Sequence, residues 1–145
     1  MRDFRIDGIV PIIPTPFFAD HSPNWESLRG LIGFAHAGGC CAICLPAYAS
    51  EFYKLSEDER LEAVARAVEY AAGRILVIAQ VNFATPHMVI EAAAVARDNG
   101  ATALCSAIPR LMPLREKISL LIALAYWSRS SFPSSFKTSI PGEPR

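Results

Sequence analysis

Short apolar runs alternate with longer amphipathic stretches along most of the 145-residue chain. The runs have the length of β-strands, and each is followed by a loop and then by a segment with helical periodicity. Four such strand-to-helix units can be counted. The predicted strands are Gly8–Pro14, Cys41–Leu45, Ile75–Val81 and Ala103–Ala107.

Three of the predicted helices have clear start signals. Asn24 stands where an N-cap is needed, and Thr85 is followed by Pro86, which suits a cap and a first helical position. The segment Ser56-Glu57-Asp58-Glu59 is a capping box, in which the first and last side chains satisfy each other's backbone N–H groups. The expected apolar faces of the first two helices are Trp25, Leu28, Leu31, Ile32 and Ala35, and then Leu61, Val64, Ala65 and Val68.

The fourth unit runs into a helix from about Leu114 to Trp127, after which the composition changes. Residues 128–145 are rich in serine and proline and show neither strand alternation nor an apolar run. We therefore expect one α/β domain over residues 1–127 and a poorly ordered tail over residues 128–145.

Strands that alternate with helices predict a parallel sheet, because a parallel connection needs a crossover helix. Two architectures fit this pattern. A doubly wound, flavodoxin-like domain has about this length, whereas a complete (β/α)₈ barrel needs about 250 residues. Length alone therefore favours the doubly wound fold.

Composition narrows the possible partners. The chain is 52% hydrophobic and 19% charged, and fourteen basic residues balance fourteen acidic ones. No electrostatic footprint for nucleic acid follows from this charge, and no apolar run approaches the ~18 residues of a membrane span. The N-terminus shows no secretory leader, so we expect a cytoplasmic protein with a small-molecule partner, without nucleic acid or membrane contact.

The cysteines and histidines do not form a convincing site in the sequence. Cys41 and Cys44 have C-x-x-C spacing, but positions three apart on a strand point to opposite faces, and no second ligand pair exists. We expect all four cysteines to be small buried hydrophobic residues and predict no metal site. The histidines, at positions 21, 36 and 87, fall in a loop and in two different helices, where surface or structural roles are expected.

Several separate stretches resemble one family in order and spacing. The segment Gly8–Phe17 ends in Thr-Pro-Phe, Gly38-Gly39 follows the first helix, and Glu51-Phe-Tyr-Lys-Leu-Ser-Glu-Asp-Glu-Arg60 follows the second strand. This pattern resembles the dihydrodipicolinate synthase / N-acetylneuraminate lyase family from about Gly8 to Lys117. The resemblance implies the N-terminal half of a (β/α)₈ TIM barrel, which reverses the judgement from length.

The resemblance also implies a chemistry. Family members bind a pyruvate-type 2-keto acid as a Schiff base to a lysine on the sixth strand, so they are carbon–carbon lyases or aldolases that need no cofactor. The chain has three lysines, Lys54, Lys117 and Lys137, and none stands at a matching position. The relay tyrosine expected near Thr138 is missing as well. We therefore predict no catalytic residues and an inactive chain, truncated before that lysine.

The loop after the second strand is the most informative remaining part of the family's site. Where the family has Gly-Thr-Thr-Gly-Glu for the keto-acid carboxylate, this sequence has Ala47-Tyr-Ala-Ser-Glu51. The candidate substrate-binding residues are thus Tyr48, Ala49 and Ser50, with the Tyr48 and Ser50 hydroxyls as possible donors. The alternative is a purely structural role, in which Tyr48 only packs at the mouth of the barrel.

Two further hypotheses remain open. Four strands leave unpaired edges and an apolar inner surface, which predicts homo-oligomers or aggregation of a non-catalytic half-barrel. A doubly wound nucleotide-binding or flavin-binding domain is the third possibility.

The segment Pro109-Arg110-Leu111, in place of the family's Pro-Tyr-Tyr, argues against lysine biosynthesis as the reaction.

Overall fold

The computed structural model describes residues 6–83 and 85–106. Helices and strands alternate within these ranges, as the hydrophobic pattern predicts. The predicted fourth helix, Leu114–Trp127, and the predicted tail lie outside the described residues. The elements are α1 (Trp25–Ala37), β1 (Ala42–Leu45), the 3₁₀ turns η1 (Tyr48–Ser50) and η2 (Phe52–Lys54), α2 (Glu57–Ala71), β2 (Leu76–Gln80), α3 (Pro86–Asp98) and β3 (Ala103–Cys105).

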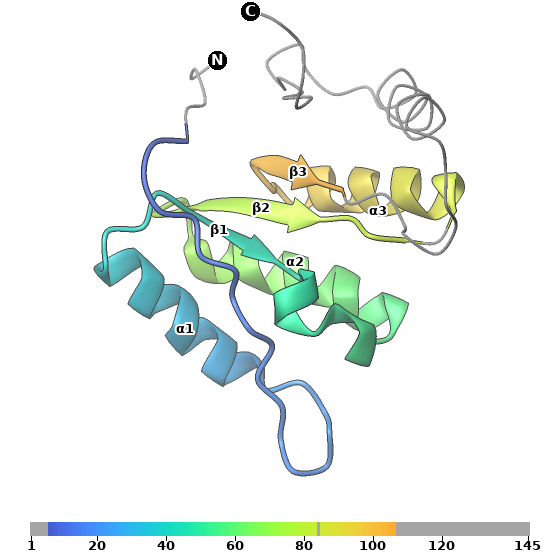
Figure 1. Ribbon diagram of the computed structural model, residues 1–145, viewed down its shortest axis with the longest axis horizontal. Coiled ribbons are helices and arrows are strands. Elements are labelled where there is room, and N and C mark those ends of the chain that lie inside the picture. Colours follow the sequence, from blue (N-terminus) through green and yellow to red (C-terminus); the bar gives the residue numbers. More distant parts are fainter. Residues whose placement is uncertain (1–5, 84, 107–145) are drawn as a thin grey trace, which may run out of the picture.

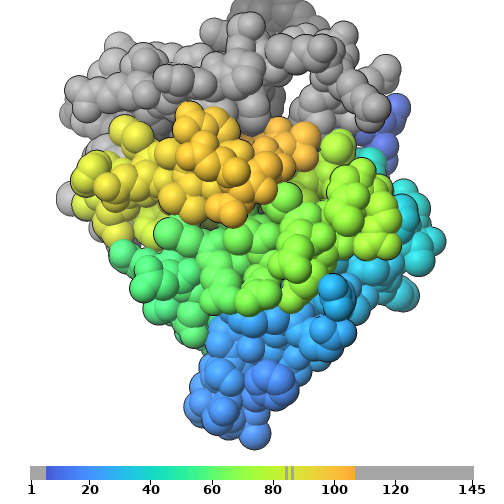
Figure 2. All heavy atoms as spheres, turned by 180° about the vertical axis from the view of Figure 1, so that it is seen from behind, coloured from blue at the N-terminus to red at the C-terminus, as the bar shows by residue number. Residues whose placement is uncertain are grey.

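The three strands form one parallel sheet in the order β1-β2-β3. Residue Cys44 is in register with Ile78, which is in register with Ala103. Figure 1 shows the strands side by side, and Figure 2 shows successive segments of the chain occupying adjoining bands of the surface. Helices α2 and α3 make the two crossovers between neighbouring parallel strands, so the predicted α/β class is confirmed.

The first predicted strand lies beside β1 but does not form a regular ladder with it. A single parallel bridge joins Ile12 to Cys44, and the amides of Cys41, Ile13 and Cys44 make bonds of 3.0 to 3.2 Å between the two segments. Pro11 interrupts the pairing because it has no N–H to donate. The segment therefore takes the position of a strand at the sheet edge without the full hydrogen-bond pattern of one.

All three helices cover the same face of the sheet. The side chains of Ile43, Leu45 and Val77 are buried against α1 and α2, while Ala79 is buried against α2 and α3. The opposite face, which we call the open face, carries a small cluster of Ala42, Ile78 and Ala103. No described helix contributes to this cluster, so the core of the described part is one-sided.

The predicted helix starts are confirmed. The Asn24 side chain accepts from the amide of Ser27, and that of Thr85 accepts from the amide of Met88. Both bonds of the capping box are present, because Ser56 Oγ accepts from the Glu59 amide at 3.2 Å and Glu59 accepts from the Ser56 amide at 2.8 Å. These caps fix where α1, α2 and α3 begin.

The apolar face predicted for α2 was only partly right. Val64 is buried as expected, but Ala65 is only half-buried, and the residues that face the core were missed. These are small residues that let the helix approach the sheet and α1 closely, together with one tyrosine. The buried residues of α2 are Ala63, Val64, Ala67, Tyr70 and Ala71.

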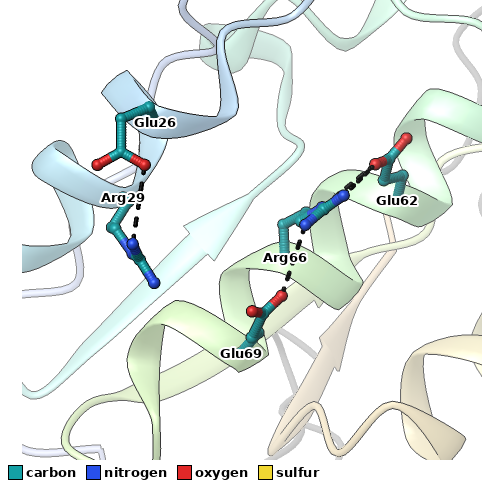
Figure 3. A network of polar contacts seen from close by, with 5 residues as sticks. All are labelled: Glu26, Arg29, Glu62, Arg66 and Glu69. Carbon is teal, nitrogen blue, oxygen red and sulfur yellow. Dashed lines mark hydrogen bonds and ion pairs between the residues drawn. The ribbon is translucent and has the colours of Figure 1, made fainter.

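Surface ion pairs join neighbouring turns within α1 and α2. Arg66 lies between Glu62 at 3.1 Å and Glu69 at 3.8 Å on α2, and Arg29 lies 3.8 Å from Glu26 on α1 (Figure 3). All of these side chains are well exposed, and exposed pairs of this kind contribute little to stability. None of the described helices is long and apolar enough to cross a membrane.

Candidate functional site

The loop that follows β1 lies at the carboxyl end of the parallel strands, where a (β/α)₈ barrel places its site. The chain turns through a cis peptide bond between Leu45 and Pro46 and then forms η1 and η2. Between the two turns, Glu51 adopts a left-handed conformation with φ of 57°. Its amide donates to Tyr48 O at 3.0 Å, so the loop is closed by its own backbone.

Ser50 anchors this loop to the N-terminal segment. The residue is 0% exposed, and its Oγ donates to the backbone oxygen of Ile13 at 2.6 Å. These residues lie 37 positions apart in the sequence, so the bond ties the η1 loop to the segment beside β1. Because its hydroxyl proton already has a buried acceptor, Ser50 is placed as an anchor, and its expected role as a donor to substrate stays a prediction.

Tyr48 and Ala49 lie on the outside of the same loop. Tyr48 is 70% exposed, and its ring makes an edge contact with Phe52 at 5.2 Å and a tilted contact with Tyr53 at 6.2 Å. The ring therefore packs against its neighbours in the loop, as expected for a structural role. Most of the side chain stays accessible to solvent. Tyr48 and Ala49 are thus exposed while Ser50 is buried, and a substrate-binding role for the three residues stays a prediction.

The backbone of η1 offers hydrogen-bond donors of its own. Tyr48 and Ala49 are the first two residues of the turn, and the first N–H groups of any helix lack an acceptor inside it. The first amide that the turn itself satisfies is that of Ser50, which donates to Ala47 O at 3.0 Å. Two adjacent amides at a strand end suit a carboxylate, since hydrogen bonds to an ionised acceptor are the strong ones.

Arg60 joins the loops after β1 and β2, and sequence reasoning assigned it no role. Its Nε donates to the backbone oxygen of Phe52 at 3.1 Å and a terminal nitrogen donates to that of Asn82 at 3.4 Å. The guanidinium also lies over the rings of Phe52 and Phe83, at 4.6 and 5.4 Å from their centroids. Partial burial lowers the pKa of Arg60, an effect that nearby Glu57 opposes. The only signal in the sequence was its place at the end of the Glu51–Arg60 block.

The remaining candidate groups are placed as surface residues. Lys54 is well exposed and pairs with Glu51 at 3.0 Å, while Lys117 and Lys137 lie outside the described residues. His21 and His36 are exposed, and His87 lies 3.3 Å from Glu91 on α3. Over residues 6–83 and 85–106, no three His, Cys, Asp or Glu side chains gather in a way that could hold a metal ion.

The cysteines differ from the expectation in two ways. Cys105 is exposed rather than buried, and Cys40, Cys41 and Cys44 are half-buried. Cys41 precedes the first residue of β1, so strand alternation does not separate it from Cys44, and both pack against the cluster on the open face. The prediction that Cys41 and Cys44 point to opposite faces of the strand was therefore wrong.

The thiols of Cys44 and Cys105 perturb each other's pKa values. Interaction with Cys105, together with burial, raises the pKa of Cys44. Interaction with Cys44 lowers the pKa of Cys105 to about 6, against the opposing effect of burial. Cys105 therefore carries more thiolate near neutral pH than an ordinary cysteine does.

The family is shown by sequence comparison. Residues 5–117 match the profile of the Dihydrodipicolinate synthetase family, and the chain belongs to this family. A 4-hydroxy-tetrahydrodipicolinate synthase from Aromatoleum aromaticum is 36% identical over 104 residues, which are 72% of this chain and 36% of that protein. The chain thus spans little more than a third of this relative.

Solved structures agree on the fold. Dihydrodipicolinate synthase from Bacillus clausii superposes with a TM-score of 0.81 at 29% identity, covering 88% of this chain and 43% of the other. The E. coli K12 prophage protein YagE, solved in complex with pyruvate, gives 0.79 at 21% identity and covers 83% and 41%. The prediction of a partial TIM barrel is confirmed, and the doubly wound alternative is wrong.

The buried bond of Ser50 generates a first prediction. Replacing Ser50 with Ala leaves the Ile13 oxygen without its donor, which costs about 1–3 kcal/mol of unfolding free energy. Urea denaturation followed by circular dichroism measures this loss. Ser27→Ala is the matched control, because Ser27 is exposed on α1 and its substitution should change stability by less than about 0.5 kcal/mol. Equal stabilities of the two variants would contradict the anchoring role.

The thiol pair generates a second prediction, on pH. Alkylation of Cys105 by iodoacetamide should rise as pH increases and reach half its plateau rate near pH 6, since only the thiolate reacts. Peptide mapping by mass spectrometry separates Cys105 from the other cysteines. In Cys44→Ala the midpoint should move up toward the ordinary value of about 8.5, whereas Cys40→Ala should leave it unchanged. If the pH midpoint of Cys105 alkylation were the same in Cys44→Ala as in the native chain, the interaction between the two thiols would be refuted.

Proposed function

We propose that the chain supplies the carboxylate-binding part of a 2-keto-acid site and cannot form the Schiff base by itself. The supporting observation is the position of the Tyr48 and Ala49 amides, at the carboxyl end of β1 in the loop that resembles the family's Gly-Thr-Thr-Gly-Glu. Pyruvate is the substrate model, because a family structure contains it. The protein is proposed to derive from a lyase or aldolase of this family and to work in the cytoplasm without a cofactor.

The two losses of threonine are compatible with this role. A carboxylate held by backbone N–H groups depends on the conformation of the loop more than on its side chains. Ser50 and Arg60 hold that conformation by donating hydrogen bonds to Ile13 O and Phe52 O. The exposed Tyr48 hydroxyl is proposed as an additional donor.

The environment of Lys54 argues against covalent catalysis by the described part of the chain. A Schiff-base lysine needs a desolvated or electropositive environment to be a free amine near neutral pH. Lys54 is the one lysine in the described ranges, and it is exposed and paired with a carboxylate. We therefore propose reversible keto-acid binding without turnover.

Titration of the ¹⁵N-labelled chain with pyruvate tests this proposal. The amide resonances of Tyr48 and Ala49 should shift, and methyl pyruvate, whose carboxylate is esterified, should leave them in place. Tyr48→Pro removes one N–H where Ala47 is already extended, as a residue before proline must be. It should weaken pyruvate binding about tenfold or more, whereas Tyr48→Phe keeps the amide and should weaken it less. Unchanged amide resonances with pyruvate would refute the proposal.

Self-association of the half-barrel is a second candidate. The N-terminal segment exposes apolar side chains at Ile6, Ile9 and Ile12, with Ile9 at 72% exposure, next to the one-sided sheet. Such a surface favours burial against another copy. Sedimentation velocity should show a mass that rises with protein concentration and falls in Ile9→Lys. A monomer at every concentration would count against this candidate.

A further inference from the structure

A continuous row of side-chain contacts runs from the loop after β2 to the start of η1. The Arg60 guanidinium lies over the ring of Phe83 at 5.4 Å and over that of Phe52 at 4.6 Å. The Phe52 ring in turn makes an edge contact with the Tyr48 ring at 5.2 Å. We call this row the Arg60 bridge; its members are Phe83, Arg60, Phe52 and Tyr48.

The two ends of the bridge differ in how they are held. Tyr48 is 70% exposed and belongs to η1. Phe83 is half-buried and packs against a buried cluster formed by the end of β2 and by α3. The residues of this cluster are Val81, Val89 and Ala92. The bridge therefore ties an exposed loop to the packed side of the sheet.

The contacts of Arg60 need a planar fork rather than only a positive charge. Its Nε donates to Phe52 O at 3.1 Å and a terminal nitrogen donates to Asn82 O at 3.4 Å, while the guanidinium also meets two rings. A lysine carries one compact ammonium group on a flexible stem and cannot reproduce this set of contacts. The bridge thus depends on the shape of the Arg60 side chain.

The bridge also reaches the backbone of the candidate site. Phe52 accepts from Arg60 through its carbonyl oxygen, and its amide donates to Ala47 O at 3.3 Å. Ala47 is the residue immediately before the Tyr48 and Ala49 amides. A displacement of Phe52 is therefore passed directly to the backbone that carries these two N–H groups.

We propose that Phe83, acting through Arg60 and Phe52, is a positioning residue for the carboxylate site at the Tyr48 and Ala49 amides. This inference rests on the proposed function of those amides. Phe83 does not touch the carboxylate. It provides a packed face against which the guanidinium lies, and the guanidinium fixes the loop that carries the two donors.

Spectra of the ¹⁵N-labelled 145-residue chain without ligand are the first part of the test. Arg60→Lys and Phe83→Leu should both shift the amide resonances of Tyr48 and Ala49, because each variant breaks the bridge. The dispersion of the remaining resonances checks that each variant is folded.

Two matched controls should leave the Tyr48 and Ala49 resonances in place. Arg74→Lys alters an arginine that also donates to two backbone oxygens, those of Tyr70 and Ala71, but that precedes β2 at the opposite end of the sheet. Phe34→Leu alters a phenylalanine that is exposed on α1.

Titration with pyruvate then separates positioning from stability. Arg60→Lys and Phe83→Leu should each weaken pyruvate binding about fivefold. Arg74→Lys should keep the native affinity, although it should lose as much stability as Arg60→Lys does in urea denaturation. A purely structural role of the bridge would make affinity follow stability in all three variants.

Unchanged resonances and native pyruvate affinity in both bridge variants would overturn the inference. A loss of affinity confined to Arg60→Lys would overturn it as well, because Phe83 would then have no part. If pyruvate shifted no amide of the native chain, the proposed function would fail instead, and the ligand-free spectra would still decide whether Phe83 positions the loop.

Discussion

Parallel pairing of β1, β2 and β3 is the constraint on which the rest of the structure depends. Each parallel connection requires a crossover, and crossovers of one hand bring the helices to the same face of the sheet. Small residues such as Ala63, Ala67 and Ala71 allow α2 to lie close to that face. The consequence is a well-packed side under the helices and an open face that carries Cys44 and Cys105.

The same arrangement explains where the candidate keto-acid site lies. Parallel strands end at a common edge, so the loops after β1 and β2 meet there, and Arg60 connects them through Phe52 O and Asn82 O. Ser50 holds the first loop through its hydrogen bond to Ile13 O. The proposed site uses backbone amides of Tyr48 and Ala49, so its geometry would depend on this support more than on the side chains of the loop.

Local signals in the sequence predicted the fold well. The capping box at Ser56, the caps at Asn24 and Thr85, and the apolar runs of the three described strands all appear as expected, because each depends on neighbouring residues. The irregular first strand follows from Pro11, which the apolar pattern does not register.

Features that depend on distant contacts could not be predicted from the sequence. The buried bond of Ser50 joins residues far apart in the chain, and the placement of Cys44 and Cys105 on one face of the sheet depends on the register of three strands. Only the resemblance to a family, which rests on matching motifs, pointed to the barrel rather than to a doubly wound domain. Motifs also located the loop of the candidate site, but they did not indicate which of its side chains are buried.

Covalent trapping is the most direct test of the central claim that this chain binds a keto acid without forming a Schiff base. The chain would be incubated with pyruvate and borohydride, which reduces an imine to a stable amine, and its mass would be measured. The synthase from Aromatoleum aromaticum serves as positive control, and the acid-denatured chain gives the background from surface lysines. We expect no adduct above this background; a single stoichiometric adduct on the folded chain would contradict the claim.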